Sequence, residues 1–188
     1  MNIVIFGGSF NPIHTGHAMI ANTVAMRHDV DEVWMMVSPR NPLKDKDEMI
    51  PEEERLRLVR LVADQCKGVK GSDFEFNLPR PSFTYNTLCE LKKAYPEHNF
   101  KLLIGSDNWK IFNRWRDSVR IISEFGVIIY QRPDAVVNPP FPEGVTLIED
   151  VPMMMVSSSY IRSQLKEGRD VRFLVPDVIY NELEYGRK

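Results

Sequence analysis

The stretch best equipped for chemistry lies near the start of the chain, in the run FGGSFNPIHTGH. Gly7 and Gly8 follow an apolar segment, and without a Cβ they let the backbone turn sharply and approach a ligand closely. The backbone N–H groups of Ser9 and Phe10 are then placed to face an anion. This loop is therefore a candidate cradle for phosphate oxygens.

Two histidines, His14 and His17, follow the loop at the expected start of a helix, with Thr15 as the candidate N-cap residue. His17 is expected in the first helical turn, where the helix dipole favours negative charge, and His14 at its lip. The alternative is a turn with two surface histidines satisfied by their neighbours. The glycines, the proline and the strand-to-helix position favour the phosphate cradle.

Other phosphate-binding and metal-binding motifs do not fit this stretch. The sequence lacks GxxxxGKS or GxxxxGKT, the signature of a P-loop, and it has no GxGxxG after the first apolar run. HTGH could supply two metal ligands, but zinc needs a third, and HExxH is absent. A phosphate site of another type is the interpretation that remains.

A second candidate phosphate segment, VSSSYIRSQL, lies late in the chain. Its serines, Ser157, Ser158 and Ser159, can cap a helix and donate hydrogen bonds to phosphate. Ile161 is expected to pack inward, and Arg162 lies one turn further along. The alternative is an ordinary serine-capped surface helix, so the segment gains weight only beside the histidines.

Strand-like and helix-like segments alternate along the chain and define the expected fold class. Apolar runs predict strands over residues 2–7, 31–38, 74–77, 101–107, 126–132 and 144–150. Helical spacing predicts helices over residues 15–28, 52–67, 84–95, 159–167 and 176–185. The pattern is that of an α/β protein with a doubly wound parallel sheet, a single domain over residues 1–188 and a C-terminal helical segment. In such sheets ligands bind outside the carboxyl ends of the strands, where both phosphate segments and residues 105–109 fall.

The composition is that of a soluble globular protein. Of the 188 residues, 43% are hydrophobic and 27% are charged, which is enough for a sizeable core. The net charge of −2 argues against a broad nucleic-acid or anionic-membrane surface, and no apolar run is long enough to span a bilayer. The N-terminus lacks the basic region of a signal peptide, and Cys66 and Cys89 have no CxxC spacing. We therefore expect a cytoplasmic protein with two free thiols.

The two phosphate segments together carry a resemblance to a known superfamily. GGSFNPIHTGH resembles the signature of the HxGH nucleotidyltransferases, and VSSSYIRSQL resembles their ISSTxIR segment. Members of that superfamily join a nucleoside triphosphate to a phosphate acceptor and release pyrophosphate. The resemblance implies an enzyme with a Rossmann-like nucleotidyltransferase fold.

The rest of the chain resembles one family of that superfamily, the bacterial nicotinate-nucleotide adenylyltransferases. In the same order as theirs, the chain has PRNPLK for PxxPHK, RPSFTYNTL for RPSYTxxTL, IGSDNWKIFNRW for IGxDxxxxxxxW, then QRPD and FLVPDVIYNELEYG. The resemblance covers essentially the whole chain. It implies adenylyl transfer from ATP to nicotinate mononucleotide, giving nicotinate adenine dinucleotide and pyrophosphate in NAD biosynthesis.

The resemblance also implies which residues act. The expected catalytic residues are His14, His17, Lys44 and Arg162. The expected ATP site comprises Gly7, Gly8, Ser9, Phe10, His14, His17, Gly105, Asp107, Arg132, Ser158, Ser159 and Arg162. The expected acceptor site comprises Ser9, Lys44, Thr84, Trp115 and Arg116. In it Trp115 stacks on the pyridine ring, while backbone N–H groups near Thr84 and after Trp115 receive the carboxylate.

Several of these side chains have a plainer interpretation. Asp107, expected to accept from ribose hydroxyls, could instead cap the next helix, and Trp115 could belong to the core. Lys44 could be solvated in a charged loop, Thr84 could be a helix N-cap, and Arg132 could form a structural ion pair. The sequence leaves these alternatives open.

The sequence departs from the family pattern around both substrates. Ser9 and Asn11 stand where the family often has Thr and Asp, and both changes keep a polar side chain. Leu43 replaces a histidine, Phe83 replaces a tyrosine, and Arg116 stands where a tyrosine is frequent. A guanidinium at this last position could reinforce selectivity for a carboxylate or could point to solvent.

The expected reaction is a direct in-line attack of the mononucleotide phosphate on the α-phosphorus of ATP. Mg²⁺ is the expected cofactor, held through water and ATP oxygens, with no protein ligand named. The expected partners are small-molecule substrates, neither nucleic acid nor membrane, and homo-oligomer formation is left open. The rival hypotheses are an adenylyltransferase for nicotinamide mononucleotide or phosphopantetheine, and a non-catalytic nucleotide-binding module.

Overall fold

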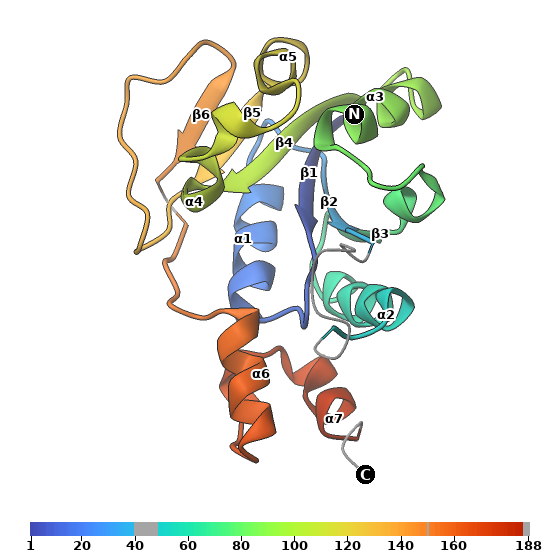
Figure 1. The fold of residues 1–188 in the computed structure, drawn as a ribbon, viewed down its shortest axis with the longest axis vertical. Helices are drawn as coiled ribbons and strands as arrows, with labels where there is room; N and C mark the ends of the chain where they lie inside the picture. Colours follow the sequence, from blue (N-terminus) through green and yellow to red (C-terminus); the bar gives the residue numbers. More distant parts are fainter. Residues whose placement is uncertain (40–48, 150, 186–188) are drawn as a thin grey trace.

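The computed structural model describes residues 1–39, 49–149 and 151–185, and its centre is a six-stranded parallel sheet (Figure 1). The strands are β1 (Asn2–Gly8), β2 (Glu32–Val37), β3 (Val69–Ser72), β4 (Asn99–Gly105), β5 (Val127–Tyr130) and β6 (Val145–Ile148). They lie in the order β3-β2-β1-β4-β5-β6, and every neighbouring pair is parallel. The chain winds outward from β1 to β3 and then returns to place β4 on the other side of β1. The expected doubly wound sheet is confirmed, with its switch point between β1 and β4.

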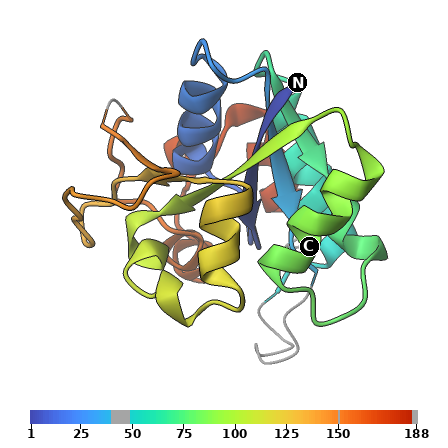
Figure 2. The same cartoon turned by 90° about the horizontal axis from the view of Figure 1, so that it is seen from above.

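Helices cover both faces of this sheet (Figure 2). They are α1 (Thr15–Ala25), α2 (Glu52–Ala63), α3 (Thr84–Ala94), α4 (Ser106–Trp109), α5 (Ser118–Glu124), α6 (Ser158–Lys166) and α7 (Asp177–Tyr185), with 3-10 turns η2 (Phe74–Asn77), η3 (Phe112–Arg114) and η4 (Arg172–Leu174). One hydrophobic cluster joins α1, α2, α6 and α7 to the sheet, and a second joins α3 and α5 to its other face. Among the described residues, no helix combines the length and the apolar character needed to cross a lipid bilayer.

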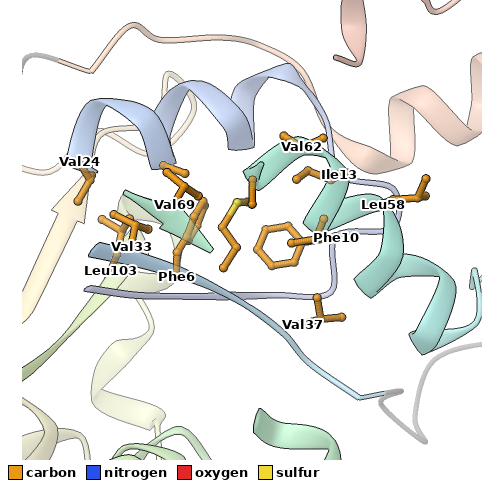
Figure 3. Packing of buried hydrophobic residues seen from close by; sticks show 14 of the residues in the cluster. Phe6, Phe10, Ile13, Val24, Val33, Val37, Leu58, Val62, Val69 and Leu103 are labelled. Carbon is orange, nitrogen blue, oxygen red and sulfur yellow. The ribbon is translucent and has the colours of Figure 1, made fainter. Parts of the chain in front are cut away.

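The central strands are buried on both faces, which explains their unbroken apolar runs. On β1, Val4 and Phe6 pack into the first cluster, while Ile3 and Ile5 pack into the second. Figure 3 shows Phe6 and Val24 in the first cluster, between the sheet and α1. A strand covered by helices on both sides needs no polar residue at alternate positions, so its sequence lacks alternation.

One expected strand is wrong, and one helix was not expected. Residues 74–77 form the 3-10 turn η2, and the third strand is the preceding VKGS of β3. Gly68, with φ of +78°, turns the chain directly from α2 into β3, an edge strand in which only Val69 is buried. Such a strand buries too little to need an apolar run. Residues 118–124, which the periodicity left unassigned, form α5.

Candidate active site

Two adjoining cavities lie at the carboxyl ends of β1, β4 and β5. The central cavity, of about 160 Å³, has a lining that includes Gly7, Gly8, Ser38, Glu75, Thr84, Thr87, Gly105, Asn108, Trp115 and Tyr130. The histidine cavity, of about 30 Å³, has a lining that includes His14, Gly16, His17, Tyr130, Arg132, Met154 and Val156. Tyr130, the last residue of β5, lines both cavities. Of the expected residues, Gly7, Gly8, Gly105, Thr84 and Trp115 line the central cavity, and His14, His17 and Arg132 line the histidine cavity.

The loop between β1 and α1 leaves one side open to a ligand. A Cβ on Gly7 would meet no atom within 4 Å, so this glycine faces open space in the central cavity. A Cβ on Gly8 would lie 3.1 Å from the ring of Phe10. Phe10 is buried and has a φ of +43°, a conformation that bulky residues rarely adopt and that is most often found at functional sites. Its ring packs edge-on against that of Phe6, with ring centroids 5.6 Å apart.

His14 and His17 cap the first turn of α1 for each other. His14 is the N-cap residue, so the expectation for Thr15 is wrong. The backbone N–H of His17 donates to Nδ1 of His14 at 3.4 Å, and that of His14 donates to Nδ1 of His17 at 3.3 Å. The two rings stack with their centroids 3.6 Å apart. Because each Nδ1 accepts a hydrogen bond, each neutral ring carries its proton on Nε2, where it can be donated to a ligand.

Both imidazoles are kept neutral by their surroundings. Burial, followed by the positive charge of Arg132, lowers the pKa of His14 from 6.5 to about 4. Burial is also the main cause that lowers the pKa of His17 well below its usual value, with smaller contributions from His14 and Arg132. Phe10 packs edge-on against His17, with ring centroids 5.0 Å apart. At neutral pH the pair therefore offers two hydrogen-bond donors rather than two cations.

The late serine–arginine segment docks onto the same loop. Ser158 Oγ donates to the carbonyl of Pro12 at 2.9 Å, and Arg162 Nη1 donates to the carbonyl of Asn11 at 2.7 Å. Ile161 is fully buried, as expected. The two phosphate segments, far apart in sequence, are thus held together by direct hydrogen bonds.

A glycine that was not among the expected site residues permits this docking. A Cβ on Gly16 would lie 3.0 Å from Val156 and 3.2 Å from the ring of His14. Any side chain at this position would push the segment before α6 away from the histidines. The third residue of HTGH therefore has a packing role that its pattern alone did not reveal.

Half of the expected ATP residues lie outside the lining of both cavities: Ser9, Phe10, Asp107, Ser158, Ser159 and Arg162. Ser159 is exposed, and its hydroxyl accepts from Arg162 Nη2 at 3.4 Å. Ser157 is the N-cap of α6 and accepts from the backbone N–H of Tyr160 at 3.2 Å. The structure brings this segment to the site through its attachment to the β1–α1 loop.

The end of β4 has room for no side chain at its last residue. A Cβ on Gly105 would overlap Oδ1 of Asp107 and lie 3.1 Å from the side chains of Tyr130 and Arg132. The N-cap of α4 is Gly105, and Asp107 lies within the first turn of that helix, so the capping interpretation of Asp107 is wrong. Ser106 Oγ accepts from the backbone N–H of Arg132 at 2.8 Å, which ties the ends of β4 and β5 together.

Arg132 both pairs with carboxylates and faces the histidines. Its Nε lies 3.7 Å from Oδ1 of Asp107 and 3.6 Å from Oδ1 of Asp134, so the ion pair that the sequence left open is present. The same side chain lines the histidine cavity and lowers the pKa values of both histidines. Its Nε makes no hydrogen bond within the described part of the chain. Arg132 therefore brings positive potential to the cavity as well as pairing at its rim.

Thr84 and Trp115 contribute to the wall of the central cavity. Phe83 is the N-cap residue of α3, so the interpretation of Thr84 as an N-cap is wrong. Trp115 is half-buried against Phe112, with ring centroids 5.2 Å apart, and also lines the cavity, so it serves both core and site. Phe83, which precedes Thr84, contacts Arg116, which follows Trp115. The guanidinium carbon of Arg116 lies 5.0 Å from the centroid of the Phe83 ring. Two residues that depart from the family pattern therefore contact each other.

A buried carboxyl group in the central cavity was not expected from the sequence. Glu75 accepts a hydrogen bond from Thr87 Oγ1 at 3.0 Å and is also hydrogen-bonded to the hydroxyl of Ser38. Burial raises the pKa of Glu75, and the two hydrogen bonds oppose that rise. Because residues 74–77 were expected as a strand, the direction of this side chain could not be foreseen.

A buried arginine on α2 is the second feature that the sequence interpretation missed. Arg55 is 0% exposed and donates to the carbonyls of Ser9 at 2.6 Å, Ser38 at 2.9 Å and Ile50 at 3.0 Å. The available signal was spacing, since Arg55 lies three residues before the buried Leu58 and shares its helical face. Its charge, surrounded by three glutamates and another arginine, suggested a surface position instead.

The lysine predicted to act in catalysis lies outside the described residues. Lys44 and Leu43 belong to residues 40–48, so their roles stay predictions. Ser9 is half-buried, and its carbonyl is the acceptor that Arg55 uses.

The described ranges contain no cluster of three or more His, Cys, Asp or Glu side chains suited to a metal ion. Asp107 and Asp134, beside the histidine cavity, both face Arg132. Mg²⁺ prefers oxygen ligands and usually keeps several of its waters.

The fold and its paired phosphate segments define a nucleotidyltransferase, and comparison with known proteins agrees. Residues 5–164 match the family model described as Cytidylyltransferase-like. The solved structure of Plasmodium falciparum nicotinic acid mononucleotide adenylyltransferase complexed with NaAD shares the fold, with a TM-score of 0.80 at 21% sequence identity. That alignment covers 99% of this chain and 96% of the other.

Two relatives place the chain more narrowly. Both are named "Probable nicotinate-nucleotide adenylyltransferase". The protein from Bacteroides thetaiotaomicron is 49% identical over 98% of this chain and 92% of its own length. The one from Bacteroides fragilis is 45% identical over 95% of this chain and 89% of its own length. The chain belongs to the nicotinate-nucleotide adenylyltransferase family, which confirms the resemblance stated from its motifs.

Proposed function

We propose that the protein transfers the adenylyl group of ATP to nicotinate mononucleotide, forming nicotinate adenine dinucleotide and pyrophosphate. The observation that carries the proposal is the direct docking of the serine–arginine segment onto the histidine loop, beside a second, aromatic-lined cavity. The histidine cavity presents His14, His17 and Arg132 to phosphate oxygens, the central cavity presents Trp115 to a flat ring, and Tyr130 lines both. Family membership and the shared fold support the same assignment.

ATP occupies the histidine side in this proposal. The Nε2–H groups of His14 and His17 donate to phosphate oxygens, and Arg132 supplies positive charge beside them. Ser158 and Arg162 hold the β1–α1 loop in place, and with Ser159 they contribute donors at its edge. The nucleoside lies over the end of β4, against Asp107, which pairs with Arg132 of the histidine cavity, and next to Gly105, which borders the central cavity.

The acceptor occupies the central cavity. The half-buried indole of Trp115 stacks on the pyridine ring, and backbone N–H groups at Thr84 and Arg116 receive its carboxylate. The open side of Gly7 admits the ribose phosphate, which then lies next to the phosphate loop. Ser9 and Lys44 complete the phosphate contacts in this proposal.

The reaction needs positioning and charge stabilisation more than proton transfer. An oxygen of the mononucleotide phosphate forms a bond to the α-phosphorus of ATP, and the bond to the pyrophosphate oxygen breaks with its electron pair. The attacking phosphate is already an anion, so no base has to remove a proton. Neutral imidazole donors and nearby guanidinium groups stabilise the charge that shifts to the leaving pyrophosphate. Mg²⁺ that enters with ATP neutralises part of the triphosphate charge.

The test is pyrophosphate release from MgATP with a panel of acceptors. Nicotinate mononucleotide is expected to give a kcat/KM at least about tenfold above that for nicotinamide mononucleotide or phosphopantetheine. Preference for the nicotinamide form would overturn the assignment of the pyridine pocket. Binding of nucleotides without turnover in any pair would identify a binding module instead.

A further inference from the structure

Arg55 joins three backbone segments behind the phosphate loop. Its guanidinium donates to Ser9 in the β1–α1 loop, to Ser38 after β2 and to Ile50 before α2. All three acceptors are main-chain carbonyls, and the arginine side chain is completely buried. A single cation therefore fixes the relative positions of these segments.

The hydrogen bond to Ser9 also sets the direction of the phosphate loop. In a trans peptide the C=O and the following N–H point in opposite directions. Because Arg55 donates to the carbonyl of Ser9, the N–H of Phe10 in the same peptide points away from Arg55. A charged donor on the carbonyl polarises the peptide and strengthens that N–H as a donor.

The charge of Arg55 has no hydrogen-bonded carboxylate within the described part of the chain. Glu52 acts on it through space, but the carboxylate of Glu52 accepts from Arg80 at 2.7 Å. Nη2 of Arg55 is buried without a hydrogen-bond partner in the described residues, a condition it shares only with Nε of Arg132 and of Arg162. A buried guanidinium stays charged, so an anion nearby lowers the cost of its burial.

The acceptors used by Arg55 indicate which anion this is. Ser38 lines the central cavity, and its backbone N–H donates to the carbonyl of Gly8 at 2.9 Å. Arg132 and Arg162 instead adjoin the histidine cavity and its loop. We propose that Arg55 is a positioning residue for the acceptor, which orients the phosphate loop and adds a buried positive charge behind it to bind the phosphate of the mononucleotide. This inference rests on the proposed function.

The test compares a ligand with and without its phosphate. Binding of nicotinate mononucleotide, nicotinate riboside and MgATP is measured separately by calorimetry for the wild type, Arg55→Met and Arg55→Lys. In Arg55→Met the mononucleotide is expected to bind about tenfold more weakly. The riboside is expected to change by less than about twofold, because it lacks the phosphate. MgATP, which shares the loop backbone in the proposed function, is expected to lose less affinity than the mononucleotide does. A riboside that loses affinity as much as the mononucleotide, or a mononucleotide that loses none, overturns the inference.

Arg57→Met is the matched control, since it removes the same charge from the same helix. Arg57 is exposed and pairs with Glu54 at 2.8 Å and Glu182 at 2.7 Å, so mononucleotide affinity is expected to stay within about twofold of wild type. Arg55→Lys keeps the positive charge but loses the planar set of guanidinium donors. It is expected to lower the affinity for the mononucleotide about threefold and to leave that for the riboside unchanged. If Arg55→Met does not fold, the lysine variant alone decides: affinity equal to wild type, or equal loss for the riboside, overturns the inference.

Failure of the proposed function gives a different result. A wild-type protein that does not bind nicotinate mononucleotide contradicts the proposed function itself. Wild-type binding that is unaffected by Arg55→Met contradicts only the role of the arginine.

Discussion

The two ends of the sheet differ in how completely their polar groups are hydrogen-bonded. At the amino ends of the strands, polar groups pair with one another: the backbone N–H of Asn2 donates to Asp31 at 2.7 Å, and Asn99 Nδ2 donates to Asn2 Oδ1 at 3.2 Å. The N-terminal amine lies 3.5 Å from Nδ1 of His98. At the carboxyl ends, one buried nitrogen of each of three arginines, Arg55 Nη2, Arg132 Nε and Arg162 Nε, makes no hydrogen bond within the described residues.

This difference separates an end that is complete as folded from an end that a ligand completes. Every buried side-chain nitrogen or oxygen without a hydrogen-bond partner, among the described residues, belongs to one of those three arginines. An unsatisfied buried donor costs free energy, and a cationic donor is best satisfied by an anion. The same sheet therefore has a structural end and a binding end.

The largest expected effect comes from removing a histidine at the binding end. His17→Ala is expected to lower kcat by about 10²–10³, as the loss of one donor to a transition-state oxyanion does. It also removes the group that caps the backbone N–H of His14. Pyrophosphate release at saturating substrates measures the effect. His98→Ala, at the structural end, is the control and is expected to leave kcat within about twofold. Near-wild-type turnover of His17→Ala would refute its catalytic role.

Alanine substitutions at two glycines are expected to separate effects on stability from effects on substrate binding. Gly7→Ala adds a methyl group to open space in the central cavity, so the melting temperature is expected to stay within about 2 °C while KM for the mononucleotide rises about tenfold. Gly71→Ala on β3 puts a Cβ 2.8 Å from Cγ of Arg60, and it is expected to cost about 1–3 kcal/mol of stability with KM unchanged. Thermal unfolding and initial rates test both variants. A Gly7→Ala protein that is destabilised with normal KM contradicts the distinction.

The histidine pair makes the binding end sensitive to acid. Between pH 6.5 and 4, His14 is protonated in the unfolded chain but neutral in the folded protein. The free energy of unfolding therefore rises with pH in this range and falls as the pH is lowered. His14 alone accounts for about 2 kcal/mol of loss by pH 5, or roughly 5 °C in melting temperature. His14→Asn is expected to flatten this part of the profile of the ligand-free protein. The exposed His28 provides the control, since His28→Asn should follow the wild type. An unaltered acid limb in His14→Asn would count against a neutral, buried ring.

The smallest expected effect concerns selectivity between acceptors. Arg116 is largely exposed but is held beside the cavity wall by Phe83 and by Asp117, whose Oδ2 lies 3.6 Å from its Nε. Arg116→Gln is expected to lower the preference for nicotinate over nicotinamide mononucleotide by about threefold. Arg120 is a matched control, because its guanidinium also stacks on an aromatic ring, that of Tyr85 at 4.4 Å. Neither arginine lines a cavity, but Arg116 directly follows Trp115 of the central cavity, whereas Arg120 lies on α5 and pairs with Glu124 at 2.8 Å. Equal ratios of kcat/KM in both variants would mean that Arg116 only points to solvent.

The strands that position the site could be predicted because a strand buried on both faces consists of consecutive apolar residues. β1 and β4 were expected within two residues of their observed ends. β3 was missed because an edge strand with a single buried residue leaves no such run. The residues of η2 are apolar for another reason: Phe74 and Phe76 pack against the two hydrophobic clusters from a turn.

The candidate site was predictable where local spacing carries it and not where tertiary contacts do. HTGH and SSSYIR could be singled out because their glycine, serines and capping positions are local features, and the structure brings the two segments into contact. Their roles in binding stay predictions. His14 is the N-cap because its side chain and that of His17 cap each other's backbone N–H groups. The sequence does not reveal this pairing, because Thr15 is also a suitable N-cap residue. Arg55 has a role only because Ser9, distant in sequence, presents a carbonyl to it.

Tyr130 imposes a trade-off on any redesign of this enzyme. Tyr130 lines both cavities, and its ring packs against that of Phe6, with ring centroids 5.9 Å apart. A smaller residue at this position would therefore alter the histidine cavity, the proposed triphosphate site, together with the central cavity. A wider substrate range therefore has to be sought at the walls that belong to one chamber only, such as Trp115.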